Sequence, residues 1–419
     1  MAKAIAICAD GTGNTSSKSV SNVYRLIEML ALDDPQRQVV VYDQGIGTPR
    51  SGLRAARALE RLHDTKGFHV LKGPIALGPF NRVVRPIQMA FGIGLARNVS
   101  QLYRALAQWY EECDTVYFFG FSRGAFTVRA LAGLIHRCGL PQKATADFDR
   151  LFGEAWGHFK PMQYNKAVVD AWRRSWNQRP CVVHFLGVWD TVKSYGGLRP
   201  RLLPHLRHNP IVQTIRHAVA LDEKRGWYNV TTWGRLDQDR DGAMTRIPSL
   251  DLTAIAKQDI REVWFRGCHS DIGGGDKEES TAIIARQWMF GEVCDPELAF
   301  LKQGGQPLVI NDVGKRFLER EIRTTVAKIP PRDAEDQSPK IHESLTRFWS
   351  FVDLIPRLEI DNTGHWPRRR AQCPGELHAY RSPELFLRDG TVSFHDSVGD
   401  LSCGREARVV STRLRTQMT

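Results

Sequence analysis

The 419-residue sequence predicts an α/β fold, in which a mostly parallel sheet is flanked by helices and elaborated by cap-like insertions. Short apolar or β-branched runs of strand length alternate with longer stretches whose apolar residues recur at helical spacing. Hydrophobic residues make up 42% of the chain and charged residues 25%, as in a soluble globular protein with a sizeable core. No stretch has the composition of a flexible linker, which favours one elaborated domain over two separate ones.

The expected strands are nearly uninterrupted apolar runs, and they lie at residues 4–9, 39–43, 115–121, 182–189 and 263–267. The expected helices alternate with them, at residues 20–32, 94–112, 125–138, 166–176 and 281–290. Residues 198–217 are rich in Pro and Arg and are expected to form a connection.

The expected domain spans residues 1–419 and has its core in residues 1–300. Residues 50–88 carry eight basic residues against two acidic ones and are expected to form a basic insertion or lid. Residues 301–419 combine charged segments with Pro-rich turns and are expected to form a cap and a C-terminal elaboration.

Charge and cysteine usage narrow the environment of the protein. The net charge of +12 indicates a surface that attracts anions: nucleic acid, anionic lipid headgroups or an acidic substrate. The eight cysteines are scattered without a CxxC pair, which favours a reducing cytoplasm over a disulfide framework or a zinc site. The apolar runs are too short to span a membrane, and the N-terminus reads as a first strand rather than a signal peptide. We therefore expect a cytoplasmic location.

The most informative segment is residues 114–126, which run from an apolar strand through Gly-Phe-Ser-Arg-Gly into a helix. A serine on so tight a turn adopts strained backbone angles, and glycines at Gly120 and Gly124 relieve the crowding around it. The hydroxyl of Ser122 then stands clear of the sheet at the positive end of the following helix. This context predicts a nucleophile, against the alternatives of a structural turn serine or an inactive scaffold.

Two later strands end in residue types that can activate a serine. Asp190 and His269 each stand where an apolar strand gives way to a loop. Side chains at the carboxyl ends of parallel strands gather at one edge of the sheet. We expect His269 to accept the proton of Ser122 and Asp190 to orient the imidazole. The alternatives for these roles are the acids Asp222 and Asp271 and the bases His217, His342 and His395.

An acyl-transfer site also needs two N–H groups that stabilise an oxyanion. The first is expected from Arg123, the residue after the serine. The second is expected from Gly11 or Thr12, in the glycine-rich loop after the first strand, with Asp10 shaping that loop. The alternative is an ordinary turn that caps the helix at 20–32.

Together these segments resemble a bacterial family of uncharacterised α/β-hydrolase domains that includes type VI secretion phospholipase effectors. The resemblance covers roughly residues 4–290 and is carried by DGTGN at 10–14, NVYRL at 22–26, GIGT at 45–48, GFSRGA at 120–125 with RALAG at 129–133, HAVALDE at 217–223, and 262–275. It implies an esterase or phospholipase, often acting on glycerophospholipids, with Ser122, Asp190 and His269 as the triad. The sequence departs from the family at Gly13, where a bulky residue is expected.

The sequence thus predicts an α/β-hydrolase-like serine hydrolase that cleaves acyl esters of a phospholipase-like substrate through an acyl-Ser122 intermediate. Alternatives are a small-molecule esterase or thioesterase without a membrane role, and a basic binding protein on an inactive hydrolase fold. We expect no cofactor, no metal and no nucleic-acid partner. The glycines at 45–52 and 92–94 do not favour a dinucleotide site, because neither group gives GxGxxG between a strand and a helix with an acidic residue about 20 positions on. Peripheral contact with an anionic membrane surface, export by a specialised secretion system and a secretion or immunity partner stay open.

Overall fold

The computed structural model describes residues 2–11, 20–45, 66–71, 94–143, 146–192, 203–225, 228, 230–233, 252–275, 280–318, 342, 344 and 393–394. Within them lies one sheet of eight strands in the order β3-β2-β1-β4-β5-β6-β7-β8, and every neighbouring pair is parallel. The strands are β1 (Ala4–Ala9), β2 (Gln38–Asp43), β3 (Phe68–Leu71), β4 (Thr115–Phe121), β5 (Val183–Trp189), β6 (Val212–Ala220), β7 (Asp259–Phe265) and β8 (Ser393–Phe394).

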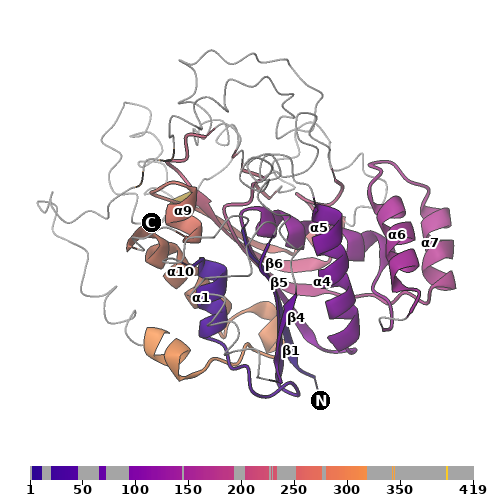
Figure 1. The fold of residues 1–419 in the computed structure, drawn as a ribbon, viewed down its shortest axis with the longest axis horizontal. Coiled ribbons are helices and arrows are strands. Elements are labelled where there is room, and N and C mark those ends of the chain that lie inside the picture. Colours follow the sequence, from indigo (N-terminus) through magenta and orange to yellow (C-terminus); the bar gives the residue numbers. More distant parts are fainter. Residues whose placement is uncertain are drawn as a thin grey trace, which may run out of the picture.

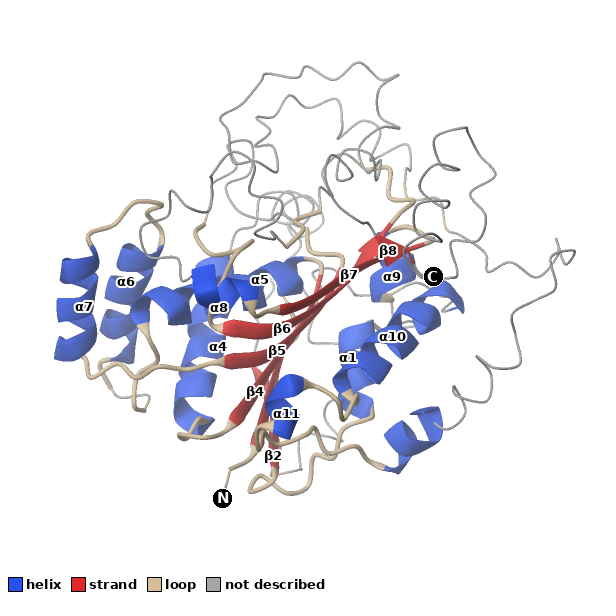
Figure 2. Ribbon diagram, turned by 180° about the vertical axis from the view of Figure 1, so that it is seen from behind, coloured by secondary structure: helices blue, strands red, loops and turns tan. Residues whose placement is uncertain are grey.

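Helices cover both faces of this sheet, as Figure 1 shows with the sheet seen nearly edge-on. On one side lie α4 (Leu95–Trp109), α5 (Arg123–Cys138), α6 (Phe148–Phe159) and α7 (Lys166–Ser175). On the other lie α1 (Asn22–Glu28), α9 (His269–Gly273) and α10 (Ser280–Val293). The reverse view in Figure 2 also shows α8 (Leu252–Ala256) and α11 (Ala299–Lys302). The predicted α/β architecture is confirmed.

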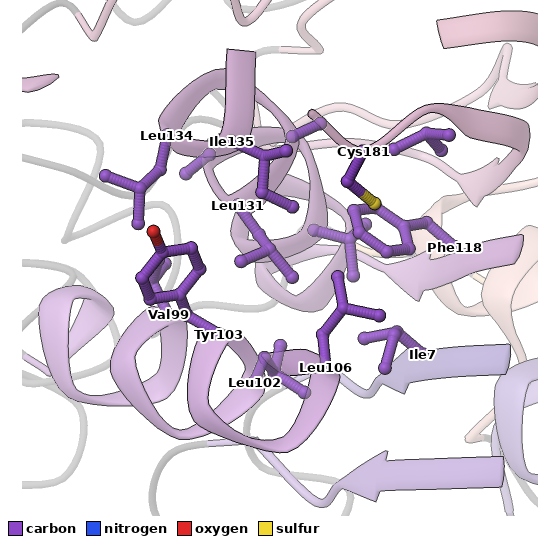
Figure 3. Close-up of a cluster of buried hydrophobic side chains, with 14 of the residues drawn as sticks. Ile7, Val99, Leu102, Tyr103, Leu106, Phe118, Leu131, Leu134, Ile135 and Cys181 are labelled. Carbon is purple, nitrogen blue, oxygen red and sulfur yellow. The ribbon is translucent and has the colours of Figure 1, made fainter. Parts of the chain in front are cut away.

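Each face of the sheet has its own apolar core. In β4, Phe118 packs into the core beneath α4 and α5, whereas Phe119 packs into the core beneath α1 and α10. Figure 3 shows the first core, where leucines of α4 and α5 meet Ile7 of β1 and Phe118. Burial of such a side chain stabilises the fold by about 1.5–3 kcal/mol. Burial on both faces explains why these strands read as continuous apolar runs.

The sequence predicted several elements closely and missed others. The strands at 4–9 and 115–121 have the predicted bounds, and the five expected helices are all present with shifted ends. The expectation for residues 198–217 is wrong, because β6 begins at Val212 inside this stretch. The strand expected at 263–267 begins earlier, at Asp259, and ends at Phe265. Its first half was not predicted, because the polar residues Asp259 and Arg261 interrupt the apolar pattern there.

Some sequence-based expectations concern residues outside the described ranges. Thr12, His395, most of the 50–88 insertion and most of 301–419 lie there. The described residues just after 300 continue the core on the face of α1 and α10, where Leu308 is buried and Phe317 packs against the same cluster. In the parts of the chain that are described, no helix combines the length and apolarity needed to cross a membrane.

Candidate active site

Ser122 occupies the turn between β4 and α5 in a strained backbone conformation. Its φ of 57° and ψ of −119° lie where residues with a side chain are rarely found. A Cβ atom on Gly120 would lie 2.6 Å from Ala125 Cα, and one on Gly124 would lie 2.1 Å from the carbonyl oxygen of Ala9. Both glycines therefore let the turn close, as their spacing in the sequence predicted.

Asp190 directly follows β5, and its carboxylate is fully buried. Its N–H donates to the carbonyl oxygen of Ala218 at 2.7 Å, and its Oδ1 accepts the N–H of Ala220 at 3.0 Å. Both partners belong to the neighbouring strand β6. These contacts leave Oδ2 directed at His269, whose Nδ1 lies 2.5 Å away.

His269 is the first residue of α9, and its imidazole lies between the other two side chains. Its Nε2 is 2.7 Å from Ser122 Oγ, opposite the contact of Nδ1 with Asp190. An ionised carboxylate only accepts hydrogen bonds, so Nδ1 carries the proton and Nε2 is free to accept the Ser122 hydroxyl proton. The ring centroids of Phe121 and Tyr228 lie 4.6 and 4.8 Å from that of the imidazole. The structure thus brings together the three residues that the sequence singled out.

Burial governs the protonation of His269. Desolvation lowers the pKa of its imidazole below the ordinary value of 6.5, and the hydrogen bond and negative charge of Asp190 oppose that shift. Arg225 adds to the lowering, and Glu223 opposes it. Because the net direction is downward, the neutral form that can accept a proton predominates near neutral pH.

Gly11, two residues after the end of β1, lies beside the serine. A Cβ atom on Gly11 would lie 3.2 Å from Ser122 Cβ, which shows how closely this backbone approaches. Asp10 holds the loop: its carboxylate accepts the N–H of Gly11 at 2.7 Å and the hydroxyls of Ser21 and Tyr42 at 2.6 and 2.7 Å. The Gly11 N–H thus donates to Asp10, and Thr12, the other expected oxyanion donor, lies outside the described residues.

Arg123, the expected first oxyanion donor, is the first residue of α5. Its N–H belongs to the initial helical turn, whose N–H groups have no intrahelical partner and carry the positive end of the helix dipole. Burial lowers the pKa of its guanidinium to about 10, and Tyr228 opposes the shift. The backbone of Arg123 therefore suits the role that its position after Ser122 predicts.

The described alternative acids and bases make contacts of their own. Asp222 accepts from Arg266 Nε at 2.9 Å and from the N–H of Gly267 at 2.7 Å. His217 accepts the N–H of Thr191 at 3.2 Å and lies 2.8 Å from a carboxylate oxygen of Glu262. These residues support the turns around the site. Asp271 and His342 contact each other through Oδ1 and Nδ1.

Sequence reasoning missed the pair Glu223 and Arg225 as parts of the site. Glu223 accepts the N–H of His269 at 3.1 Å and binds Arg225 through both carboxylate oxygens, at 2.8 and 2.7 Å. The guanidinium of Arg225 lies 3.6 Å from the ring centroid of Tyr228. Recognition of β6 would have placed these residues at the same sheet edge as Asp190. Across the described ranges, no group of three or more His, Cys, Asp and Glu side chains is arranged to hold a metal ion.

Comparison with known proteins agrees with the resemblance found in the sequence. Residues 3–292 match the family model described as "T6SS, Phospholipase effector Tle1-like, catalytic domain". An uncharacterized protein of Saccharomyces cerevisiae is 30% identical over 232 residues, which are 54% of this chain and 32% of that protein. The chain thus spans about a third of this curated relative.

Two solved structures are also similar to the chain. The crystal structure of an uncharacterized protein from Pseudomonas aeruginosa shares 16% identity with a TM-score of 0.36, covering 76% of this chain and 48% of that one. A structure of the Tle1 effector bound to the VgrG spike from the type 6 secretion system shares 17% identity with a TM-score of 0.25, and the match covers 65% of this chain and 51% of that one.

Proposed function

We propose that this chain, which belongs to the family of Tle1-like phospholipase effectors of type VI secretion systems, hydrolyses acyl esters through an acyl-Ser122 intermediate. The observation that carries the proposal is the line of contacts from Ser122 Oγ to His269 Nε2, at 2.7 Å, and from His269 Nδ1 to Asp190 Oδ2, at 2.5 Å. This order of hydroxyl, imidazole and carboxylate is that of an activated serine.

The proposed reaction follows from these positions. As Ser122 Oγ attacks the ester carbonyl, its proton passes to Nε2 of His269, and Asp190 stabilises the imidazolium that forms. The N–H of Arg123 and a second N–H, which we assign to Thr12 because that of Gly11 donates to Asp10, stabilise the negative oxygen of the tetrahedral intermediate. His269 then gives the proton to the departing alcohol. Water, deprotonated by His269, attacks the acyl-serine and releases the carboxylic acid with Ser122 restored.

A phospholipid is the substrate class that we propose, because the family description names phospholipases. The net charge of +12 supports it, since a cationic surface attracts anionic headgroups. Delivery by a type VI secretion system is part of the same proposal, on the same family description.

The proposal is tested by fluorophosphonate labelling and by fatty-acid release from vesicles that contain phosphatidylglycerol. The wild type is expected to take the probe at Ser122 and to release fatty acid, whereas Ser122→Ala and His269→Ala lose turnover by about 10⁴-fold or more. Ser175→Ala, which changes a serine in α7, is the matched control and should keep full activity. A folded wild type that stays unlabelled with and without vesicles contradicts the proposal. Labelling with cleavage of soluble esters only would point to a small-molecule esterase.

A further inference from the structure

Asp271 is a buried carboxylate that shapes the start of α9, the helix that begins with His269. It is the third residue of this helix, and its Oδ2 accepts the N–H of Cys268, the residue just before His269, at 2.9 Å. Its side chain is 0% exposed. The preceding turn is tight, because a Cβ atom on Gly267 would lie 2.4 Å from Asp271 Cβ. The position of Asp271 and the position of the His269 backbone are thus linked.

His342 comes from far along the chain and contacts this carboxylate twice. Its Nδ1 lies 2.5 Å from Asp271 Oδ1, and its backbone N–H donates to Oδ2 at 3.1 Å. Since a carboxylate only accepts, Nδ1 is the donor. The His342 side chain is 25% exposed, whereas that of Asp271 is fully buried. Together with Cys268, it satisfies a charge that would otherwise be buried at a high free-energy cost.

Ser344 makes a second contact next to the same site. Its Oγ accepts the N–H of Lys224 at 3.3 Å. Lys224 lies between Glu223, which accepts the N–H of His269, and Arg225, which Glu223 binds. His342 and Ser344 therefore contact the two segments next to His269: α9, through Asp271, and residues 223–225, through Lys224.

We infer that His342 and Ser344, which lie outside the family match at 3–292, are positioning residues that hold His269 in line with Ser122 and Asp190. The inference rests on the proposed function. Its physical reason is the shortness of α9, which has five residues. A helix of this length is not stable by itself, so its orientation depends on the contacts of its side chains. The active site is then complete only when part of the C-terminal third is in place.

The test compares full-length variants on a soluble ester and in fluorophosphonate labelling. His342→Ala should lower kcat and the labelling rate by about 10- to 100-fold with KM unchanged, as expected for a misaligned base. His342→Asn should recover most of the loss, because the amide Nδ2 can donate to Asp271 as Nδ1 does. Ser344→Ala removes one hydroxyl and should lower kcat and the labelling rate by roughly threefold, as expected for the loss of one neutral hydrogen bond. His158→Ala, in α6, is the matched control.

The pH profile separates positioning from a loss of folded protein. Among the described residues, Asp190, Glu223, Arg225 and Tyr228 lie around His269, with Cys268 and Asp271 on either side of it in the chain, and the contact with Asp190 opposes the lowering of the His269 pKa by burial. When α9 shifts and this contact loosens, that pKa falls. The acidic limb of the labelling rate should therefore move to lower pH in His342→Ala. A smaller folded fraction would lower the amplitude and leave the midpoint in place.

Each result decides the inference. If folded His342→Ala keeps kcat within twofold and the same midpoint, His342 does not position His269. If His342→Asn is as impaired as His342→Ala, the contact with Asp271 is not the cause. If His342→Ala fails to fold, Ser344→Ala decides: a folded Ser344→Ala variant with a normal kcat and labelling rate overturns the inference. A wild type without turnover and labelling overturns the proposed function instead.

Discussion

Replacement of Asp190 by Asn tests the proposed mechanism at the atom that sets the tautomer of His269. The Ala220 N–H donates to Oδ1 of Asp190 at 3.0 Å, so the amide oxygen of an asparagine would take that position. Its NH₂ group would then face Nδ1 of His269, where Oδ2 now lies at 2.5 Å. An NH₂ group only donates, so the imidazole would carry its proton on Nε2 and could not accept the proton of Ser122.

The expected loss of kcat is therefore the loss that follows when His269 is held in the wrong tautomer. A fall of about 10⁴-fold in kcat corresponds to ~5.5 kcal/mol of lost transition-state stabilisation. The side chain keeps its volume and its bond to Ala220, so the melting temperature should change little. Turnover on a soluble ester, the labelling rate and thermal melting by circular dichroism measure these quantities. Asp170→Asn, which alters the half-buried partner of Lys166 in α7, is the matched control.

A folded Asp190→Asn variant with kcat within tenfold of the wild type would refute this reasoning. In that case Asp190 does not set the tautomer of His269. Asp222, the other acid that follows a strand in this region, would then be the next residue to replace.

Two further predictions follow from the tight turn at Ser122 and from the burial of the His269 imidazole. Gly124→Ala should lower the free energy of unfolding by ~3 kcal/mol in urea, because its Cβ would lie 2.1 Å from the Ala9 carbonyl oxygen. Gly153→Ala, whose Cβ would meet nothing within 4 Å in α6, should raise it by ~0.5–1 kcal/mol, and equal stabilities would contradict the packing argument. The value of kcat/KM should fall as the pH falls through the pKa of His269, because the protonated imidazole cannot accept the Ser122 proton. The midpoint should lie below the ordinary 6.5, because burial lowers this pKa. A midpoint above 6.5 would contradict that assignment.

The sequence predicted the positions of Ser122, Asp190 and His269 because each one follows a strand with a readable apolar run. The strand ends are in register: Ala9 pairs with Gly120, and Phe121 pairs with Trp189. Residues that follow such strands must meet at the same edge of a parallel sheet. Periodicity and the GxSxG spacing therefore placed these three side chains at one edge of the sheet, while Asp222, Asp271, His217, His342 and His395 stayed as alternatives.

The sequence could not predict β6, because this strand buries charged residues. Arg216 is fully buried, and its guanidinium binds Asp259 and Glu292. His217 is also fully buried beside Glu262. Charged residues usually indicate an exposed segment, because a buried charge needs a partner. The partners of Arg216 and His217 are distant in the sequence, so the sequence alone could not reveal that these residues are buried in a strand. Without β6, Glu223 and Arg225 could not be assigned to the site.

The two strained residues of the site are held by neighbouring strands rather than by their own loops. Ser122 and Asp190 have φ values of 57° and 39°, and each such conformation costs about 1–3 kcal/mol. The N–H of Ser122 donates to Trp189 in β5 at 3.0 Å, and the N–H of Asp190 donates to Ala218 in β6 at 2.7 Å. Adjacent parallel strands thus offset the strain with backbone hydrogen bonds. The β4-β5-β6 order therefore fixes the spacing of hydroxyl and carboxylate, and α9 alone must be positioned by side-chain contacts.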